Sequence, residues 1–138
     1  IGKLFRRAAQ LVEVGSCRRA EARDSMGRAV RPESRRAVSF DVGGAIFRAA
    51  LEYCGNVRDA SRMLCDANRI ADKKARVVSG RGVASLNDSE FDDDRRAACM
   101  SNFLDELADE HGAPPGDDGV RECADCGVEF IGANHGCM

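Results

Sequence analysis

The chain of 138 residues contains no tryptophan and only seven other aromatic residues, six phenylalanines and one tyrosine. Its core must therefore be built from alanine, valine, leucine, isoleucine and a few phenylalanines. No apolar run reaches the roughly 18 residues that a membrane helix needs, and residues 1–7 lack a long apolar stretch, so we expect neither a membrane segment nor a retained secretion signal. With only two histidines and no Gly-x-Ser-x-Gly, phosphate-loop or dinucleotide motif, no catalytic constellation stands out.

The composition, 43% hydrophobic and 32% charged, is that of one folded domain. Apolar residues recur at helical spacing in four stretches, which predict helices over about 4–15, 37–54, 57–75 and 92–110. The predicted fold class is all-α, a small bundle of about four helices with a C-terminal zinc-knuckle appendage. The predicted domains are a helical domain over 1–112, a linker rich in proline and glycine over 113–119, and a zinc-knuckle tail over 120–138.

Local signals refine this outline. Asp24-Ser25-Met26-Gly27 predicts a turn. The pair Gly43-Gly44 lowers the helix propensity in the middle of the second predicted helix, so we expect another backbone to pack closely there. Val83–Leu86 is interpreted as a brief extended stretch. Asn87-Asp88-Ser89 offer side-chain oxygens that can cap the fourth helix. Asp92–Asp94 are interpreted as acids that stabilise the N-terminus of that helix.

Charge is distributed unevenly, although the net charge is only −2. Residues 1–40 carry a net +6, residues 41–88 a net +2 and residues 89–138 a net −10. One interpretation is that the basic and acidic halves neutralise each other or are simply solvated. The other is that the basic half binds an anionic partner such as nucleic acid.

The second interpretation names a set of candidate nucleic-acid-binding residues in the N-terminal half: Arg18, Arg19, Arg23, Arg28, Arg31, Arg35 and Arg36. Against it, the isoelectric point is near 5.7, the arginines lack interleaved aromatics for base stacking, and no helix-turn-helix signature is visible.

The seven cysteines are odd in number, and four of them are scattered through helix-like segments. A disulfide framework is therefore not expected, the scattered cysteines are interpreted as small buried hydrophobes, and a reducing cytoplasmic location is predicted.

The other three cysteines crowd into the last sixteen residues. Cys123 and Cys126 form a Cys-x-x-Cys-Gly knuckle, and His135 and Cys137 can complete a tetrahedral site, so the sequence predicts one structural Zn²⁺ held by these four side chains. A redox-active pair and an incidental cysteine-containing tail are the alternatives.

Several short motifs resemble a known family. Residues 22–32 read A-R-D-S-M-G-R-A-V-R-P, residues 44–49 read G-A-I-F-R-A, and Asn87-Asp88 follows later. In this order they resemble small actinobacterial and phage proteins catalogued as a domain of unknown function, whose pattern has a tryptophan where this chain has Leu86 and cysteines where it has residues 39–42. The resemblance covers roughly residues 4–110 and implies a small helical domain with a phage or mobile-element origin. It assigns no activity, because the family has none assigned.

Three functional hypotheses follow. The first is a non-enzymatic interaction or regulatory protein whose zinc tail and acidic last helix contact a protein partner. The alternative is a nucleic-acid-binding protein using the arginine-rich half. An enzyme ranks third, and it would require a pocket lined by the loop residues Arg23, Asp24, Asn87 and Asp88, because loops carry function more often than helices do.

Overall fold

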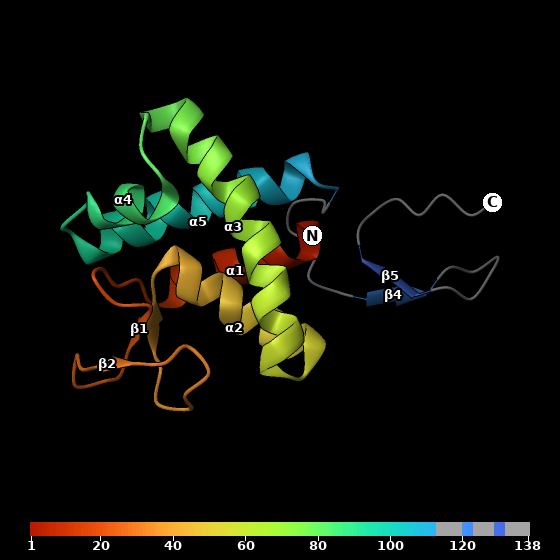
Figure 1. The fold of residues 1–138 in the computed structure, drawn as a ribbon, viewed down its shortest axis with the longest axis horizontal. Coiled ribbons are helices and arrows are strands. Elements are labelled where there is room, and N and C mark those ends of the chain that lie inside the picture. The colour runs from red at the N-terminus through yellow and green to blue at the C-terminus, as the bar shows by residue number, and fades with distance from the viewer. Residues whose placement is uncertain (113–119, 123–128, 132–138) are drawn as a thin grey trace.

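Helices dominate the part of the chain that the structure, a computed structural model, describes, which is residues 1–112, 120–122 and 129–131 (Figure 1). In chain order the elements are α1 (Gly2–Val14), β1 (Ala22–Arg23), β2 (Ala29–Val30), β3 (Ser39–Phe40), α2 (Val42–Cys54), α3 (Val57–Ser79), α4 (Val83–Asp88), α5 (Asp93–Glu110), β4 (Val120–Glu122) and β5 (Glu129–Ile131).

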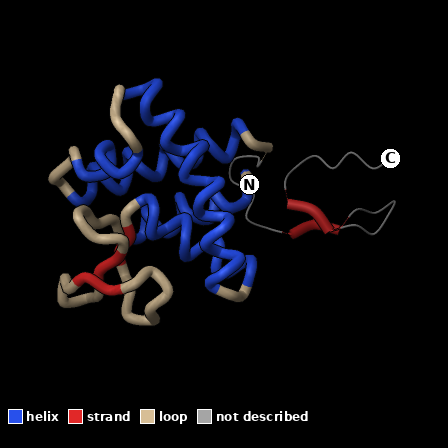
Figure 2. Tube along the Cα trace, viewed as in Figure 1, coloured by secondary structure: helices blue, strands red, loops and turns tan. Residues whose placement is uncertain are grey.

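The helices form the bundle that the apolar spacing predicts. Helix α1 packs against both α5 and α2, and α2 in turn packs against α3 (Figure 2). The side of α3 that is fully buried carries only alanine, which lets the helices approach closely. Its four buried residues are Ala60, Ala67, Ala71 and Ala75. The larger core side chains come mainly from α1, α2 and α5; those that are almost wholly buried include Leu4, Phe5, Val12, Val42, Ile46, Leu104 and Leu107.

The helix ends agree with the capping signals. Asp92 lies at the N-cap of α5 and accepts a hydrogen bond from the Arg95 backbone N–H, so the acidic run does serve helix initiation. Gly55 ends α2 in the left-handed conformation, at φ 77°. The turn predicted at Asp24–Gly27 is also present, with the Gly27 N–H bonded to the Asp24 carbonyl.

A three-stranded antiparallel sheet, in the order β2-β1-β3, corrects the prediction that the described body is entirely helical. Ala22 pairs with Val30 on one side and with Phe40 on the other. The predicted helix over 37–54 therefore begins only at Val42. The Phe40 backbone instead donates to the Gly15 carbonyl and accepts from the Cys17 N–H, and these long-range partners override the local helical pattern.

Helix α4 is a second correction, because residues 83–86 are helical and not extended. The Asp72 carboxylate of α3 accepts a hydrogen bond from the Val83 backbone N–H at 2.7 Å. This bond satisfies an N–H group at the start of the short helix, which local propensity alone would not stabilise. Asn87 and Asp88 accordingly end α4 and do not cap α5.

Part of the charge asymmetry is neutralised inside the bundle. Arg6 of α1 is buried against α5, with its guanidinium 2.7 Å from the Asp105 carboxylate and 2.6 Å from that of Asp109. Lys74 of α3 similarly lies 2.6 Å from Glu110. The interpretation that the two halves neutralise each other therefore holds for these helices.

Of the four scattered cysteines Cys17 is buried, Cys54 is partly buried, and Cys65 and Cys99 are exposed. The interpretation as buried hydrophobes is therefore confirmed for Cys17 and wrong for Cys65 and Cys99. None of the helices within the described ranges is both long and apolar enough to cross a bilayer. After residue 112 the structure describes only β4 and β5, an antiparallel pair in which Val120 is opposite Ile131.

Candidate functional site

Four of the seven predicted arginines lie around two neighbouring hollows on the loops of the sheet. We call Arg28, Arg31, Arg35 and Arg36 the arginine face. The first hollow, of about 370 Å³, is lined by Arg28, Arg35 and Arg36, and the second, of about 430 Å³, by Arg31 and Arg36. Because both hollows include Arg36, the arginine face is one continuous surface. Figure 1 shows these loops at one edge of the helical body, next to α2.

The first supporting loop is the turn between β1 and β2. One oxygen of the buried Asp24 carboxylate accepts hydrogen bonds from the backbone N–H groups of Met26 and Arg28, each at 2.9 Å. These hydrogen bonds, with the one from Arg28 as the larger cause, lower the pKa of Asp24. Asp24 is therefore an ionised structural acid that holds the turn in shape.

The second supporting loop, residues 32–36, is held by Arg48, a residue that was not among the predicted site residues. Arg48 of α2 donates to the carbonyl oxygens of Pro32 and Ser34, both at 2.9 Å. The Ser34 hydroxyl accepts from the Arg36 backbone N–H at 3.1 Å. Arg48 thus holds the loop that presents Arg35 and Arg36, and its position within an otherwise apolar helical stretch was the signal that could have revealed it.

The four arginines of this face differ in how far their charge is already compensated. The Arg28 guanidinium lies 3.2 Å from the Asp24 carboxylate, and that of Arg31 lies 3.5 Å from Glu33. Arg35 and Arg36 are exposed, and their side chains form no hydrogen bond or ion pair with the described residues. Two guanidinium groups on this surface therefore remain available to an anion.

The other three predicted arginines lie elsewhere. Arg18 stacks on the exposed ring of Phe91, with its guanidinium carbon 3.8 Å from the ring centre. Arg23 donates to the carbonyl oxygens of Gly27 and Arg18 and so ties the β1–β2 turn to the preceding loop. Arg19 is exposed, and its backbone N–H bonds to Asp88. The predicted nucleic-acid set is thus divided between two parts of the surface.

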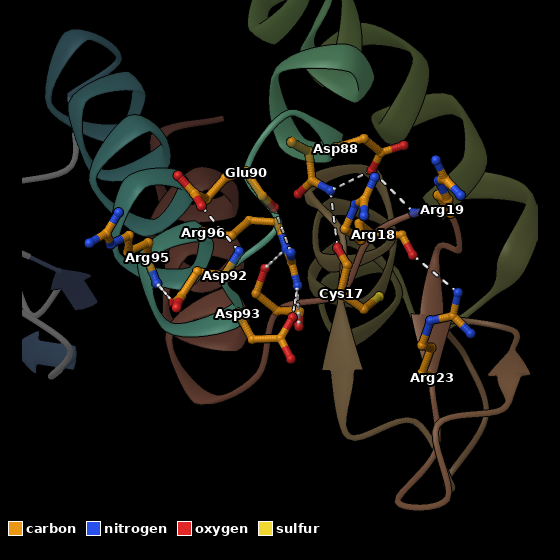
Figure 3. A network of polar contacts seen from close by, with 12 residues as sticks. Cys17, Arg18, Arg19, Arg23, Asp88, Glu90, Asp92, Asp93, Arg95 and Arg96 are labelled. Carbon is orange, nitrogen blue, oxygen red and sulfur yellow. Dashed lines mark hydrogen bonds and ion pairs between the residues drawn. The ribbon is translucent and has the colours of Figure 1, made fainter.

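The residues predicted as a possible pocket come together only in part. Asn87 donates to the Cys17 carbonyl at 3.0 Å, Asp88 accepts from the Arg19 N–H at 3.2 Å, and Arg23 donates to the Arg18 carbonyl at 3.1 Å (Figure 3). These three side chains meet on the main chain of residues 17–19. Asp24 is instead engaged in its own turn, so the structure brings three of the four residues together on this loop.

The same loop is anchored on its other side by a buried arginine. Arg96 of α5 is 1% exposed and donates to the hydroxyl and the carbonyl of Ser16, at 2.9 and 3.1 Å. It also donates to the Glu90 carbonyl and the Asp93 carboxylate, as Figure 3 shows. Arg96 therefore joins three chain segments, which are the loop at Ser16, the segment at Glu90 and the first turn of α5.

Asp41, the N-cap of α2, lies close enough to this loop for its charge to act on the Cys17 thiol. Its carboxylate accepts a hydrogen bond from the Gly44 N–H at 2.6 Å. Burial is the main cause that raises the pKa of Asp41 from its ordinary 3.8 to about 6, opposed by that hydrogen bond and reinforced by the nearby charges of Glu21 and Asp88. Burial likewise raises the pKa of the Cys17 thiol to about 11, so this thiol stays protonated at neutral pH.

The raised pKa of Asp41 predicts that Asp41→Asn increases the free energy of unfolding by an amount that depends on pH. Because the pKa is higher in the folded state, the contribution of Asp41 to stability is full below about pH 4 and is lost as the pH rises through about 6. Asparagine keeps the capping oxygen but carries no charge. We expect Asp41→Asn to raise the free energy of unfolding by about 2 kcal/mol at pH 8 and to change it little at pH 4.

Urea unfolding followed by circular dichroism at pH 4, 6 and 8 measures this effect. Asp66→Asn, at an exposed position of α3, is the matched control and should show no such pH dependence. An Asp41→Asn protein whose gain is the same at pH 4 and pH 8 would contradict the assignment.

The predicted zinc ligands Cys123, Cys126, His135 and Cys137 lie outside the described residues. Within the part of the chain that is described, no three histidine, cysteine, aspartate or glutamate side chains are grouped so as to hold a metal ion. The zinc site therefore remains a prediction from the sequence.

Comparison of the chain with protein-family models, with curated proteins and with solved structures finds no match. The resemblance to a domain of unknown function stays a prediction, and the function has to be argued from the site itself.

Proposed function

We propose that this chain is a non-enzymatic binding protein whose arginine face contacts the phosphates of a nucleic acid. The observation that carries the proposal is that Arg35 and Arg36, exposed and free of acidic partners among the described residues, lie beside Arg28 on one hollow. Paired cations on the helices contribute little to such binding, whereas unpaired guanidinium groups on a shared surface are what phosphate recognition uses.

The hypothesis that ranked first from the sequence is a protein partner contacted through the zinc tail and the acidic last helix. Its zinc tail lies outside the described ranges, and in the helix Asp105, Asp109 and Glu110 are already paired with Arg6 and Lys74. The arginine face gives the nucleic-acid alternative a defined surface, and the proposal takes that alternative for this reason. A structural Zn²⁺ bound by Cys123, Cys126, His135 and Cys137 remains part of the proposal. Native mass spectrometry with and without a chelator tests it, with one zinc ion per chain expected and lost on chelation.

Charge reversal on the arginine face tests nucleic-acid binding. We expect Arg35→Glu with Arg36→Glu to weaken binding to fluorescein-labelled 20-nucleotide DNA, single-stranded or duplex, by more than tenfold at 50 mM salt. The log–log salt slope should fall by about 0.7 per lost contact for a single strand and about 0.9 for a duplex, because each contact releases counterions. Fluorescence anisotropy across a salt series gives both quantities.

The matched control is Arg58→Glu with Arg62→Glu, which changes the net charge equally at two exposed positions of α3. It should retain most of the affinity. Equal losses in the two double variants would show that only net charge matters, and a wild-type protein that binds neither DNA would refute the proposed function.

A further inference from the structure

The first hollow of the arginine face is not purely cationic. Besides Arg28, Arg35 and Arg36 it is lined by Asp24, by Ser25 and by two apolar residues, Met26 and Val38. The Asp24 carboxylate is already paired with Arg28 and with the backbone N–H groups of its own turn. Met26 is 76% exposed and Val38 is 50% exposed, although both are large hydrophobic residues. Single exposed apolar residues are common, but here two of them share one hollow with unpaired cations.

Both apolar side chains are presented from a fixed backbone. The Met26 N–H is bonded to the Asp24 carboxylate at 2.9 Å, and the Val38 N–H to the Arg23 carbonyl at 2.9 Å. Little ordering of the main chain is therefore needed when a ligand covers them, which lowers the entropic cost of binding.

We infer that this hollow receives one unpaired nucleotide, with its base packed on Met26 and Val38 and its phosphate held by Arg35 and Arg36. This inference rests on the proposed function and specifies its substrate class as single-stranded nucleic acid. The lining of this hollow suits a ligand in which a flat apolar group is joined to an anion. The volume of about 370 Å³ lies within the range of sites for small organic ligands.

The neighbouring hollow extends the same argument along a strand. It adjoins the first at Arg36 and is also lined by Val30, Arg31, Glu33 and Ser34. Arg31 lies 3.5 Å from the Glu33 carboxylate, so Arg36, which lines both hollows, is the cation here that has no acidic partner among the described residues. Single strands are usually held by cations that follow the backbone beside aromatic side chains on which the bases stack; here Met26 and Val38 take the place of the aromatic platform. In a duplex the base faces are covered by their stacked neighbours, so Met26 and Val38 would gain no contact.

The test compares a 12-nucleotide single strand with the 12-base-pair duplex of the same sequence, by fluorescence anisotropy at 50 mM salt. We expect the single strand to bind at least tenfold more tightly. Met26→Gln with Val38→Thr keeps the side-chain size and removes apolar contact; loss of roughly 60 Å² of such contact weakens single-strand binding by about tenfold. Duplex affinity and the salt slope should not change.

Val77→Thr, at an exposed valine of α3, is the control and should leave both affinities unchanged. Equal binding of strand and duplex, or full single-strand affinity in the Met26→Gln, Val38→Thr protein, overturns the inference and leaves the proposed function standing. Displacement of the strand by polyglutamate as effectively as by unlabelled strand also overturns it, in favour of an acidic peptide. Binding of neither DNA refutes the proposed function itself.

Discussion

Replacement of Arg96 by methionine is expected to lower the free energy of unfolding by about 3–5 kcal/mol. Methionine fills much of the same space but donates no hydrogen bonds, so the buried hydroxyl and carbonyl of Ser16 and the carbonyl of Glu90 lose their donor. Leaving buried acceptors unpaired costs more than the net value of the bonds that are lost.

Urea unfolding of Arg96→Met and Arg95→Met measures the effect. Arg95 is the neighbouring residue of the same helix, it is exposed, and its side chain forms no hydrogen bond within the described ranges. Its replacement should change stability by no more than about 0.5 kcal/mol. Hydrogen exchange gives a second readout, since the Cys17 N–H, bonded to the Phe40 carbonyl, should lose protection when Arg96 is replaced. A loss below about 1 kcal/mol would mean that water replaces the guanidinium at little cost.

Gly44→Ala is expected to destabilise the protein by about 3 kcal/mol, although alanine favours helix formation. A Cβ atom at Gly44 would lie 1.9 Å from the Glu21 carbonyl oxygen and 2.7 Å from its carbon. Both are backbone atoms of the loop that leads into β1, and the Glu21 carbonyl also accepts the Asp41 N–H. The clash therefore cannot be relieved by moving a side chain.

Gly43→Ala is the matched control one residue earlier. A Cβ atom there would meet only an oxygen of Asp41, at 3.6 Å, which is ordinary contact. We expect this variant to unfold at the wild-type urea concentration or slightly above, with a gain of at most about 1 kcal/mol. If the two alanine variants were equally stable, the close approach between α2 and the Glu21 carbonyl would have to be abandoned.

The glycine pair also illustrates how far the sequence can be interpreted. Two glycines inside a helical pattern indicated a close backbone contact, and the contact exists at Gly44. The spacing could not say which glycine needs it or which segment makes it, because the Glu21 loop reaches α2 only through long-range pairing of the strands. Gly43 has no such requirement among the described residues.

The arginine face, too, could be predicted from the sequence only in part. All four residues of the arginine face were among the seven arginines singled out from charge alone, yet charge did not separate them from Arg18, Arg19 and Arg23. Arg23 is separated by its hydrogen bonds to main-chain carbonyl groups and Arg18 by its stacking on Phe91. Arg19 is separated by its position, because its backbone N–H bonds to Asp88 on another part of the surface. Arg96 could not be distinguished in the sequence from an exposed helix cation, because its hydrogen-bond partner Ser16 lies far along the chain. Arg48 had a signal in its apolar surroundings, but the sequence could not name Pro32 and Ser34 as its partners.

The sequence by itself determined the helical body, the Asp24–Gly27 turn and the capping of α5, because apolar periodicity, glycine and the Asx side chains act over a few neighbouring residues. Only the tertiary structure decided that residues 39 and 40 form a strand instead of helix and that residues 83–88 form a helix. It also decided which two residues of the arginine face, Arg35 and Arg36, keep a free charge. The strand and the short helix depend on partners more than ten residues away along the chain, whereas the free charges depend on the absence of an acidic partner among the described residues. Local propensities of a few tenths of a kcal/mol per residue, about the scale that separates ordinary residues, yield to such contacts.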